Sequence, residues 1–404
     1  MQTAAVAAPP FARRVSLIGT ENAFKIGPLI REVERGGERV IRCNVGEPDF
    51  PLPQHIAGEV KRAIDRGETH YCDPQGLESL RATIAKTMGE ERGITITPDR
   101  VVVFPGAKPP IGFAQQIYCD PGDEVIYPSP GFPIYESFTR YLGATPVPLH
   151  LDERRGFTFT ARDLAPLISG KTKLIYLNFP SNPTGGVATR EQLEEISDVI
   201  PPDVRVYSDE VYEKIVFDGA THHSIASIRG MDERTIIVSG VSKTFAWTGG
   251  RVGWAILPTV EEAEAFRNLN INYYSCVPAY NQLGAKLALE SPESAPEIAR
   301  MVAEFEKRRD FVVDALNAID GITCQRPKGA FYVFPNVGGV CARLGMTSTQ
   351  FQRFLLTNYK VATLDRRSFG VLGSEGKHYL RISIATSLED LQEATSRIAR
   401  AAKG

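Results

Sequence analysis

The chain has 404 residues, with 46 Lys and Arg against 48 Asp and Glu, which gives a formal net charge of −2. Hydrophobic residues make up 43% and charged residues 23%, an ordinary globular composition that excludes fibrous and disordered classes. This charge balance argues against a nucleic-acid-binding surface, and no stretch approaches the roughly 20 apolar residues of a membrane span. The length favours two domains, or one large domain with appendages.

The N-terminus and the cysteines indicate the cellular compartment of the protein. Arg13 and Arg14 lie in an Ala- and Pro-rich start, and the first acidic residue is Glu21. Because no apolar secretory segment follows the arginines, we interpret this start as an N-terminal arm. The six cysteines are far apart, without a Cys-x-x-Cys pair, so we expect reduced thiols and a cytoplasmic protein.

Short apolar runs alternate with longer helical stretches in the first half of the chain. The runs cover residues 101–104, 125–127, 174–177, 204–207 and 236–238. Near-continuous apolar runs are typical of parallel strands that are buried on both faces. Residues 191–200, between two of the runs, carry Leu193, Ile196 and Ile200 at helical spacing. We therefore predict an α/β fold with a mostly parallel sheet between helices.

Chemically distinctive residues follow these predicted strands. They are Gly106, Ala107, Lys108, Phe132, Asn182, Asp209 and Lys243. In open α/β sheets the ligand lies beyond the carboxyl ends of the strands, so we expect these residues to meet at one rim.

The chain from about residue 285 onward has a different pattern. A long charged helix is predicted over 293–318, then an alternating run at 329–334, strands at 361–363 and 379–383, and a final helix from Leu388. This order indicates a smaller α+β domain. We assign 1–45 to an N-terminal arm and part of the small domain, 46–285 to the large domain and 286–404 to the C-terminal small domain.

Several familiar motifs are absent from the sequence. It has no Walker A pattern, no Gly-x-Gly-x-x-Gly loop after a strand and no His-Glu-x-x-His. His222 and His223 are adjacent and would point different ways on most backbones, so we expect no metal site. Residues 240–244 depart from the Gly-x-Ser-x-Gly elbow at their last position, which argues against a serine hydrolase.

A set of other motifs remains, in a fixed order along the chain. It comprises 45–50 (VGEPDF), Tyr71, 76–81 (GLESLR), 178–185 (NFPSNPTG), 208–212 (SDEVY), Ser242-Lys243, Arg251, 327–332 (PKGAFY) and 380–383 (LRIS). Together these motifs resemble the class I/II aminotransferases, which are fold type I enzymes that use pyridoxal phosphate. The resemblance runs from about Phe24 to the C-terminus. It implies a large domain that binds this cofactor.

The resemblance assigns roles to the groups around the cofactor ring. Lys243 is the implied catalytic lysine, which forms an aldimine with the cofactor and moves a proton at the substrate α-carbon. Asp209 is the implied partner of the ring nitrogen. Tyr212 and Asn182 are the implied partners of the phenolic oxygen, and Phe132 is the implied aromatic that stacks on the ring.

The implied phosphate site joins a turn to several side chains. The turn is Gly106, Ala107 and Lys108, the side chains are Ser242 and Arg251, and Tyr71 reaches across from the second subunit of a homodimer. Many relatives carry Ser three residues before the lysine, where this chain has Gly240. We expect Ser239 to compensate.

The resemblance also implies how an amino acid is bound. Arg381 would hold the α-carboxylate, assisted by Asn182 and the Gly46 backbone. Lys108 occupies the position that meets a side-chain carboxylate in dicarboxylate-specific relatives, which favours aspartate and glutamate. Pro109 and Pro110, and residues 364–370, depart from the family pattern near the expected cleft and leave room for a specialised substrate.

Simpler structural roles would also account for single residues. Asp209 could be a helix cap, Asn182 a turn former and Phe132 a core aromatic, whereas Lys108 could cap the cleft without touching substrate, and Lys243 and Arg381 could lie on the surface.

We therefore predict a pyridoxal-phosphate-dependent aminotransferase that acts by a ping-pong mechanism on amino acids and 2-oxo acids. One alternative is a lyase or cyclase with the same cofactor site, because the cofactor carries the chemistry. The other alternative is a ligand-sensing part of a transcription regulator. The second is disfavoured because no basic helix-turn-helix precedes Gly46.

Overall fold

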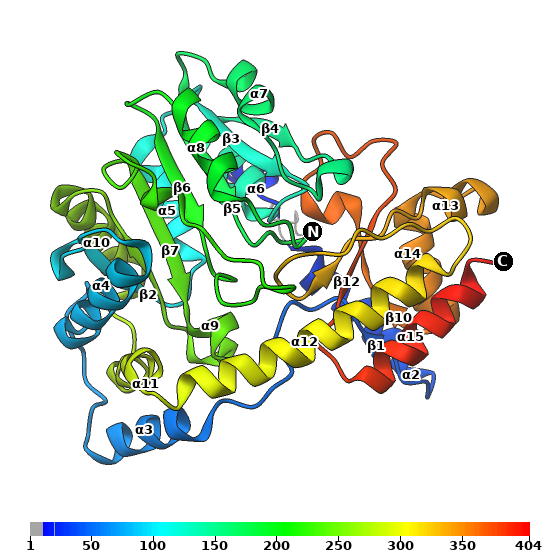
Figure 1. Cartoon of the computed structure of the whole chain (residues 1–404), viewed down its shortest axis with the longest axis horizontal. Helices are drawn as coiled ribbons and strands as arrows, with labels where there is room; N and C mark the ends of the chain where they lie inside the picture. The colour runs from blue at the N-terminus through cyan, green and yellow to red at the C-terminus, as the bar shows by residue number, and fades with distance from the viewer. Residues whose placement is uncertain (1–10, 20) are drawn as a thin grey trace, which may run out of the picture.

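A seven-stranded sheet forms the centre of the larger part of the molecule (Figure 1). The computed structural model describes residues 11–19 and 21–404. The sheet order is β2-β8-β7-β6-β5-β3-β4, and neighbours are parallel except where β8 pairs with β2 and β7. The strands are β2 (Val101–Phe104), β3 (Glu124–Ser129), β4 (Thr145–His150), β5 (Thr172–Asn178), β6 (Arg205–Asp209), β7 (Thr235–Gly240) and β8 (Gly253–Ile256). The predicted α/β fold with a mostly parallel sheet is confirmed.

Two strands of this sheet were not predicted from the sequence. β4 contains Pro146 and Pro148 and lies at the edge of the sheet, where a residue without an N–H group is tolerated. β8 is the short run GWAI and is the one strand that reverses direction within the sheet. Neither strand contains the continuous run of β-branched residues that predicts a buried strand.

Helices cover both faces of the sheet. Successive side chains on each strand point to opposite faces, and the apolar side chains on each face pack against helices. On β6, Tyr207 packs with one set of helices and Val206 with the other. The first face carries α5 (Pro109–Tyr118), α6 (Ile134–Leu142) and α10 (Val260–Tyr274). The second face carries α3 (Gln54–Asp65), α4 (Glu78–Arg92), α8 (Arg190–Val199) and α11 (Ala279–Glu290).

The C-terminal part has its own small sheets and a hydrophobic core that also includes Tyr212, Ile215 and Phe217 of the larger part. Helix α12 (Ser294–Asn317) runs from beside α11 toward α13 (Gly338–Leu344), α14 (Ser348–Tyr359) and α15 (Leu388–Ala401) (Figure 1). Strands β11 (Leu364–Asp365), β12 (Leu380–Ser383) and β9 (Tyr332–Val333) form an antiparallel sheet. Strand β1 (Ile41–Arg42) pairs in parallel with β10 (Val361–Ala362), so an N-terminal segment completes this part.

The remaining elements are short. They are η1 (Arg13–Ser16), α1 (Asn22–Lys25), α2 (Gly27–Arg35), η2 (Pro98–Arg100), η3 (Glu153–Arg155), α7 (Ala161–Leu164), η4 (Ala165–Leu167), η5 (Ile225–Ser227), α9 (Val241–Thr244), η6 (Thr248–Gly250) and η7 (Arg366–Phe369). The alternating run at 329–334 is only partly a strand, since Ala330 has a φ of 56° and β9 begins at Tyr332.

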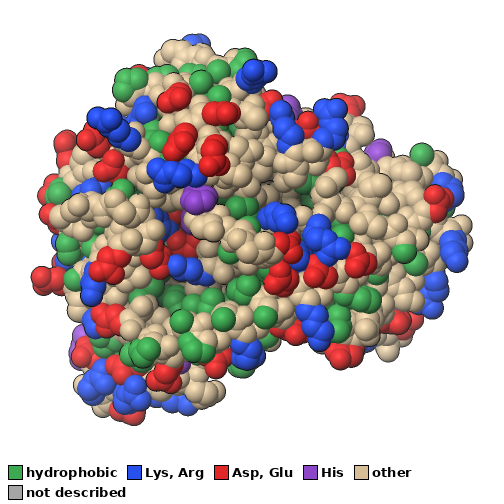
Figure 2. All heavy atoms as spheres, viewed as in Figure 1, with side chains coloured by type: hydrophobic (Ala, Val, Ile, Leu, Met, Phe, Trp, Pro, Cys, Tyr) green, Lys and Arg blue, Asp and Glu red, His purple; other side chains and the backbone are tan. Residues whose placement is uncertain are grey.

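The surface agrees with the balanced composition. Figure 2 shows Lys and Arg side chains interspersed with Asp and Glu over the visible face. Among the helices of the described residues, none is both long and apolar enough to cross a bilayer.

Candidate active site

A cavity of about 420 Å³ lies at the carboxyl ends of β5, β6 and β7. The predicted site residues that line it are Gly46, Ala107, Lys108, Phe132, Asn182, Asp209, Tyr212, Ser242, Lys243, Arg251 and Arg381. The other two predicted residues, Gly106 and Tyr71, do not line the cavity, and Gly106 packs against the Arg251 guanidinium. The sequence-based expectation of one shared rim agrees with this arrangement.

Lys243 lies in the single turn of α9, directly after β7. Its Nζ donates a hydrogen bond to the backbone oxygen of Gly46 at 2.5 Å. Burial, with a smaller contribution from the positive charge of Arg381, lowers the pKa of Lys243 to about 8. A substantial fraction of the amine is therefore neutral near physiological pH and available as a nucleophile or base.

Asp209 ends β6 and is buried on the same face as Tyr207. The Tyr135 hydroxyl, from α6, donates a hydrogen bond to Asp209 Oδ2 at 2.6 Å. Burial raises the pKa of Asp209 to about 6, and the Tyr135 hydrogen bond opposes that rise. Tyr135 was missed in the sequence, although it lies one helical turn after Phe132.

Asn178 connects the ends of two strands to the loop that carries Asn182. Its Nδ2 donates to the backbone oxygen of Asp209 at 3.1 Å, and its Oδ1 accepts from the backbone N–H of Asn182 at 2.8 Å. Asn178 was also missed, because its motif resembled a turn in which only Asn182 had an expected role. The two bonds fix Asn182 relative to Asp209.

The turn between β2 and α5 contacts Arg251. Gly106 has a φ of 93°, a conformation that favours glycine, and a Cβ there would lie 2.2 Å from Arg251 Nη2. Arg251 donates to the backbone oxygens of Thr248 and Pro105, at 2.8 and 2.9 Å. Helix α5 begins directly after this turn with Pro109 and Pro110, which have no N–H group, so the backbone N–H groups near the guanidinium are those of Ala107 and Lys108.

The expectation that Ser239 compensates for Gly240 is wrong. Ser239 Oγ donates to Glu213 Oε1 at 2.8 Å, and the serine is not among the residues that line the cavity. The reason is the alternation of side chains along β7, which puts adjacent residues on opposite faces of the sheet.

Arg381, on β12, closes the cavity from the C-terminal part. Its guanidinium donates to the backbone oxygen of Asn44 at 2.6 Å and to Asn182 Oδ1 at 3.1 Å. It also lies over the rings of Tyr332 and Phe369, 4.4 and 4.9 Å from their centroids. These contacts fix the plane of the guanidinium, which is suited to a carboxylate.

Tyr212 lies beside Arg381 and Lys243. Its hydroxyl is 2.8 Å from the Tyr332 hydroxyl, and burial together with Tyr332 raises the pKa of Tyr212 well above its usual value. Tyr212 is therefore a neutral phenol that can donate a hydrogen bond. Tyr332 belongs to the 327–332 motif, but that motif gave it no role.

Lys108 has neighbours that the sequence did not predict. Its ammonium is ion-paired with the Glu21 carboxylate and lies 5.9 Å from the ring centroid of Phe24 and 5.6 Å from that of Phe132. Glu21 and Phe24 come from the N-terminal segment and line the cavity.

Tyr71 is 88% exposed in the single chain. Tyr71 is not among the residues that line the cavity.

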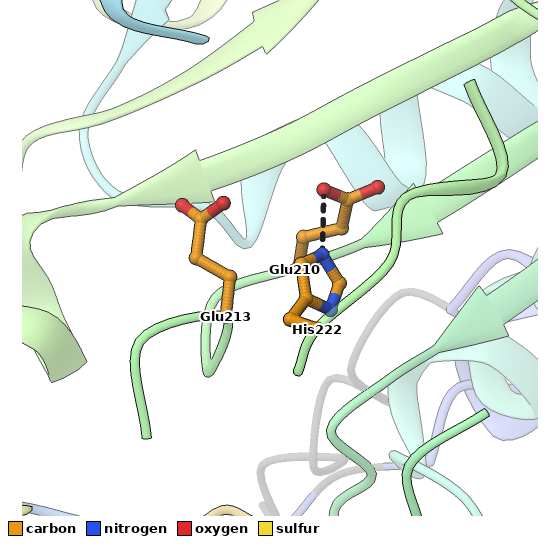
Figure 3. A group of neighbouring side chains, drawn as sticks. All are labelled: Glu210, Glu213 and His222. Carbon is orange, nitrogen blue, oxygen red and sulfur yellow. Dashed lines mark hydrogen bonds and ion pairs between the residues drawn. The ribbon is translucent and has the colours of Figure 1, made fainter. Parts of the chain in front are cut away.

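A second polar cluster lies on the opposite face of the sheet from Asp209. Figure 3 shows Glu210 and Glu213 beside His222, whose Nε2 is 3.1 Å from Glu210 Oε2. The Arg92 guanidinium is ion-paired with both carboxylates, and this guanidinium, with His222 and the hydroxyl of Ser224, holds the pKa of Glu210 well below its usual range against burial. Arg92 thus supplies the cation that these carboxylates need, and the cluster is a structural ion network.

Pyridoxal phosphate fits the chemistry of the groups around the cavity. Lys243 offers an amine for the aldehyde, and Asp209 offers a buried carboxylate for the ring nitrogen. Arg251, with the turn before α5, offers cationic and N–H groups for the phosphate. The three functions lie in one cavity, as a single small molecule requires.

Comparisons with known proteins agree with this chemistry. The sequence model of the family described as Aminotransferase class I and II matches residues 38–398. An aspartate aminotransferase of Pyrococcus abyssi is 37% identical over 371 residues, which cover 91% of this chain and 92% of the relative. An aromatic-amino-acid aminotransferase of Thermococcus litoralis is 35% identical over 92% of this chain and 94% of the relative.

Solved structures show the same architecture over nearly the whole chain. The crystal structure of the aspartate aminotransferase from Rhizobium meliloti has a TM-score of 0.91 and 35% identity, and the match covers 98% of this chain and 99% of that chain. The fold, the lysine-bearing cavity and the relatives agree. The chain belongs to the class I and II aminotransferases, and it is a pyridoxal-phosphate-dependent aminotransferase.

Proposed function

We propose that the enzyme transfers the amino group of aspartate or glutamate to a 2-oxo acid. The observation that carries this proposal is the presence in one cavity of Arg381, Lys243 and Lys108, which can meet an α-carboxylate, an α-carbon and a side-chain carboxylate. Relatives named as aspartate aminotransferases support it. The lyase alternative has no support among these relatives.

Pyridoxal phosphate, when bound, supplies the electron sink for the α-carbon. We assign the ring nitrogen to Asp209 and the phenolic oxygen to Tyr212 and Asn182. The phosphate is assigned to Gly106, Ala107, Lys108, Ser242 and Arg251, and the ring face to Phe132. The burial of Asp209 and the neutral Tyr212 phenol support these roles.

The chain's own groups then orient and deprotonate the substrate. The Arg381 guanidinium grips the α-carboxylate in two places, with Asn182 and the Gly46 backbone beside it. Lys243 Nζ, once neutral, takes the proton from the substrate α-carbon and delivers it to the C4′ carbon of the cofactor. The lowered pKa of Lys243 makes this proton transfer efficient at a pH near 8.

The site is completed, we propose, by a second copy of the chain. Tyr71 is far too exposed for its implied phosphate role within one chain, and a homodimer would carry it to the cavity of the partner subunit. We also propose that the large domain covers residues 46–285 and that residues 1–45 join residues 286–404 in the small domain. The pairing of β1 with β10 supports this division of the chain into domains. The six free cysteines fit the proposed cytoplasmic location.

Steady-state kinetics tests the proposed function. With L-aspartate and 2-oxoglutarate both varied, a ping-pong mechanism gives parallel lines in double-reciprocal plots. The Lys243→Ala variant should show no turnover above background. Intersecting lines, or product formation from aspartate that needs no oxo acid, would contradict the proposal.

A further inference from the structure

The N-terminal segment brings a carboxylate into the cavity directly opposite Lys108. Glu21 is ion-paired with the Lys108 ammonium and lines the same cavity as Phe24 and Phe132. The Lys108 side chain remains 47% exposed, so an incoming group can reach it.

The two residues that follow Glu21 are each held by a hydrogen bond to another segment of the chain. Asn22 Nδ2 donates to Ser368 Oγ at 3.0 Å, and Asn44 Nδ2 donates to the backbone oxygen of Ala23 at 3.3 Å. Glu21 therefore faces Lys108 because its backbone is held there, and not through the ion pair alone.

The charges around the substrate leave a side-chain subsite with one cation, which already has a carboxylate partner within the chain. On the proposed function, Arg251 meets the phosphate, Arg381 the α-carboxylate and Lys243 the reacting carbon. Lys108 is then the remaining cation toward the substrate side chain, and Glu21 neutralises it. Two aromatic rings, of Phe24 and Phe132, lie beside this pair.

We propose that Glu21 is a specificity-determining residue, which competes with a substrate's side-chain carboxylate for Lys108 and thereby raises the preference for aromatic over dicarboxylate substrates. The inference rests on the proposed function and deepens it. Two carboxylates on one ammonium repel each other, so an acidic side chain binds against the charge of Glu21. An aromatic side chain meets the Phe24 ring and a neutral pair, and buries no uncompensated charge.

The test measures binding to the cofactor-loaded enzyme of two ligands that cannot be transaminated. Maleate supplies two carboxylates, whereas 3-phenylpropionate supplies one carboxylate and a ring. In the Glu21→Gln variant the dissociation constant of maleate should fall about three- to fivefold, as the loss of a partly exposed ion pair allows. That of 3-phenylpropionate should change by less than about twofold.

Two further variants isolate the effect. Glu32→Gln removes one exposed carboxylate from the neighbouring helix α2 and should change neither constant. In a Lys108→Met background, Glu21→Gln should no longer tighten maleate binding, because the shared cation is gone. Equal changes for both ligands, or weaker maleate binding in Glu21→Gln, would overturn the proposal.

Turnover separates this inference from the proposed function. The ratio of kcat/KM for L-aspartate to that for L-phenylalanine should rise about three- to fivefold in Glu21→Gln. If the wild-type enzyme transaminates both substrates and Glu21→Gln leaves the ratio of kcat/KM unchanged, the proposed role of Glu21 is refuted and the proposed function is not. A wild-type enzyme that transaminates neither would refute the proposed function.

Discussion

The Tyr135→Phe substitution tests how the site keeps Asp209 ionised. The variant retains the ring, which stacks on Tyr176 with centroids 4.5 Å apart, and removes only the hydroxyl that donates to Asp209 at 2.6 Å. The next contact of the carboxylate, with the backbone N–H of Val211, is 3.5 Å long. Tyr135 is therefore the principal hydrogen-bond donor to this carboxylate among the described residues.

The expected change in the pKa of Asp209 follows from the loss of the Tyr135 hydrogen bond. A hydrogen bond to a charged group contributes about 1.5–3 kcal/mol, which corresponds to a pKa change of about one to two. Because the bond favours the ionised form, its loss raises the pKa of Asp209 from about 6 toward 7 or 8. Near pH 7 the variant would then hold a largely protonated carboxyl opposite the ring nitrogen of the cofactor.

Titration of pyridoxal phosphate into the apoprotein between pH 5.5 and 9 is the assay. The contribution of ionised Asp209 to the wild-type affinity should be lost as the pH drops below about 6, and in Tyr135→Phe this loss should begin about one pH unit or more higher. The Tyr207→Phe variant is the matched control, since the Tyr207 hydroxyl is buried without a hydrogen-bond partner among the described residues. Identical pH dependence in Tyr135→Phe and Tyr207→Phe would refute the reasoning.

The remaining predictions concern stability and assembly. Arg92→Met should lower the free energy of unfolding of the apoprotein by about 3–5 kcal/mol in urea titrations, because it strands the buried carboxylates of Glu210 and Glu213. Mixing Tyr71→Ala with Lys243→Ala subunits should restore activity to about a quarter of wild type, since half of the dimers are hybrids with one intact site.

Each of these predictions has a matched comparison. Arg190→Met breaks an exposed pair with Glu194 on α8 and should cost less than about 1 kcal/mol. A similar loss in Arg92→Met would show that the buried network is not strongly coupled. A mixture of Tyr71→Ala and Lys243→Ala subunits with no more activity than its separate components would contradict a shared site.

Much of the fold was predictable because the large sheet is buried on both faces. Strands β5, β6 and β7 each contain a short, near-continuous apolar run, and the positions at which they end determine where Asp209 and Lys243 lie. β4 was missed because its prolines argue against a strand anywhere except at an edge. Whether a strand lies at an edge depends on the whole sheet and not on local sequence.

The site was predictable residue by residue where a motif carried the chemistry, and less so where partners come from distant segments. Tyr135 and Asp209 are 74 residues apart, and Glu21 and Lys108 are 87 apart, so no local pattern links either pair. The prediction for Ser239 was wrong for a local reason. Side chains alternate between the two faces of β7, so Ser239 points toward Glu213 and not toward the cavity. That error could have been avoided from the sequence.

The most direct test of the account is the visible absorption spectrum of the purified enzyme loaded with pyridoxal phosphate. Addition of L-aspartate should make the band of the bound cofactor fade, and 2-oxoglutarate should restore it. The Lys243→Ala variant should lack this reversible cycle. A wild-type band that responds to neither L-aspartate nor L-glutamate, or a reversible cycle that persists without Lys243, would contradict transamination by this site.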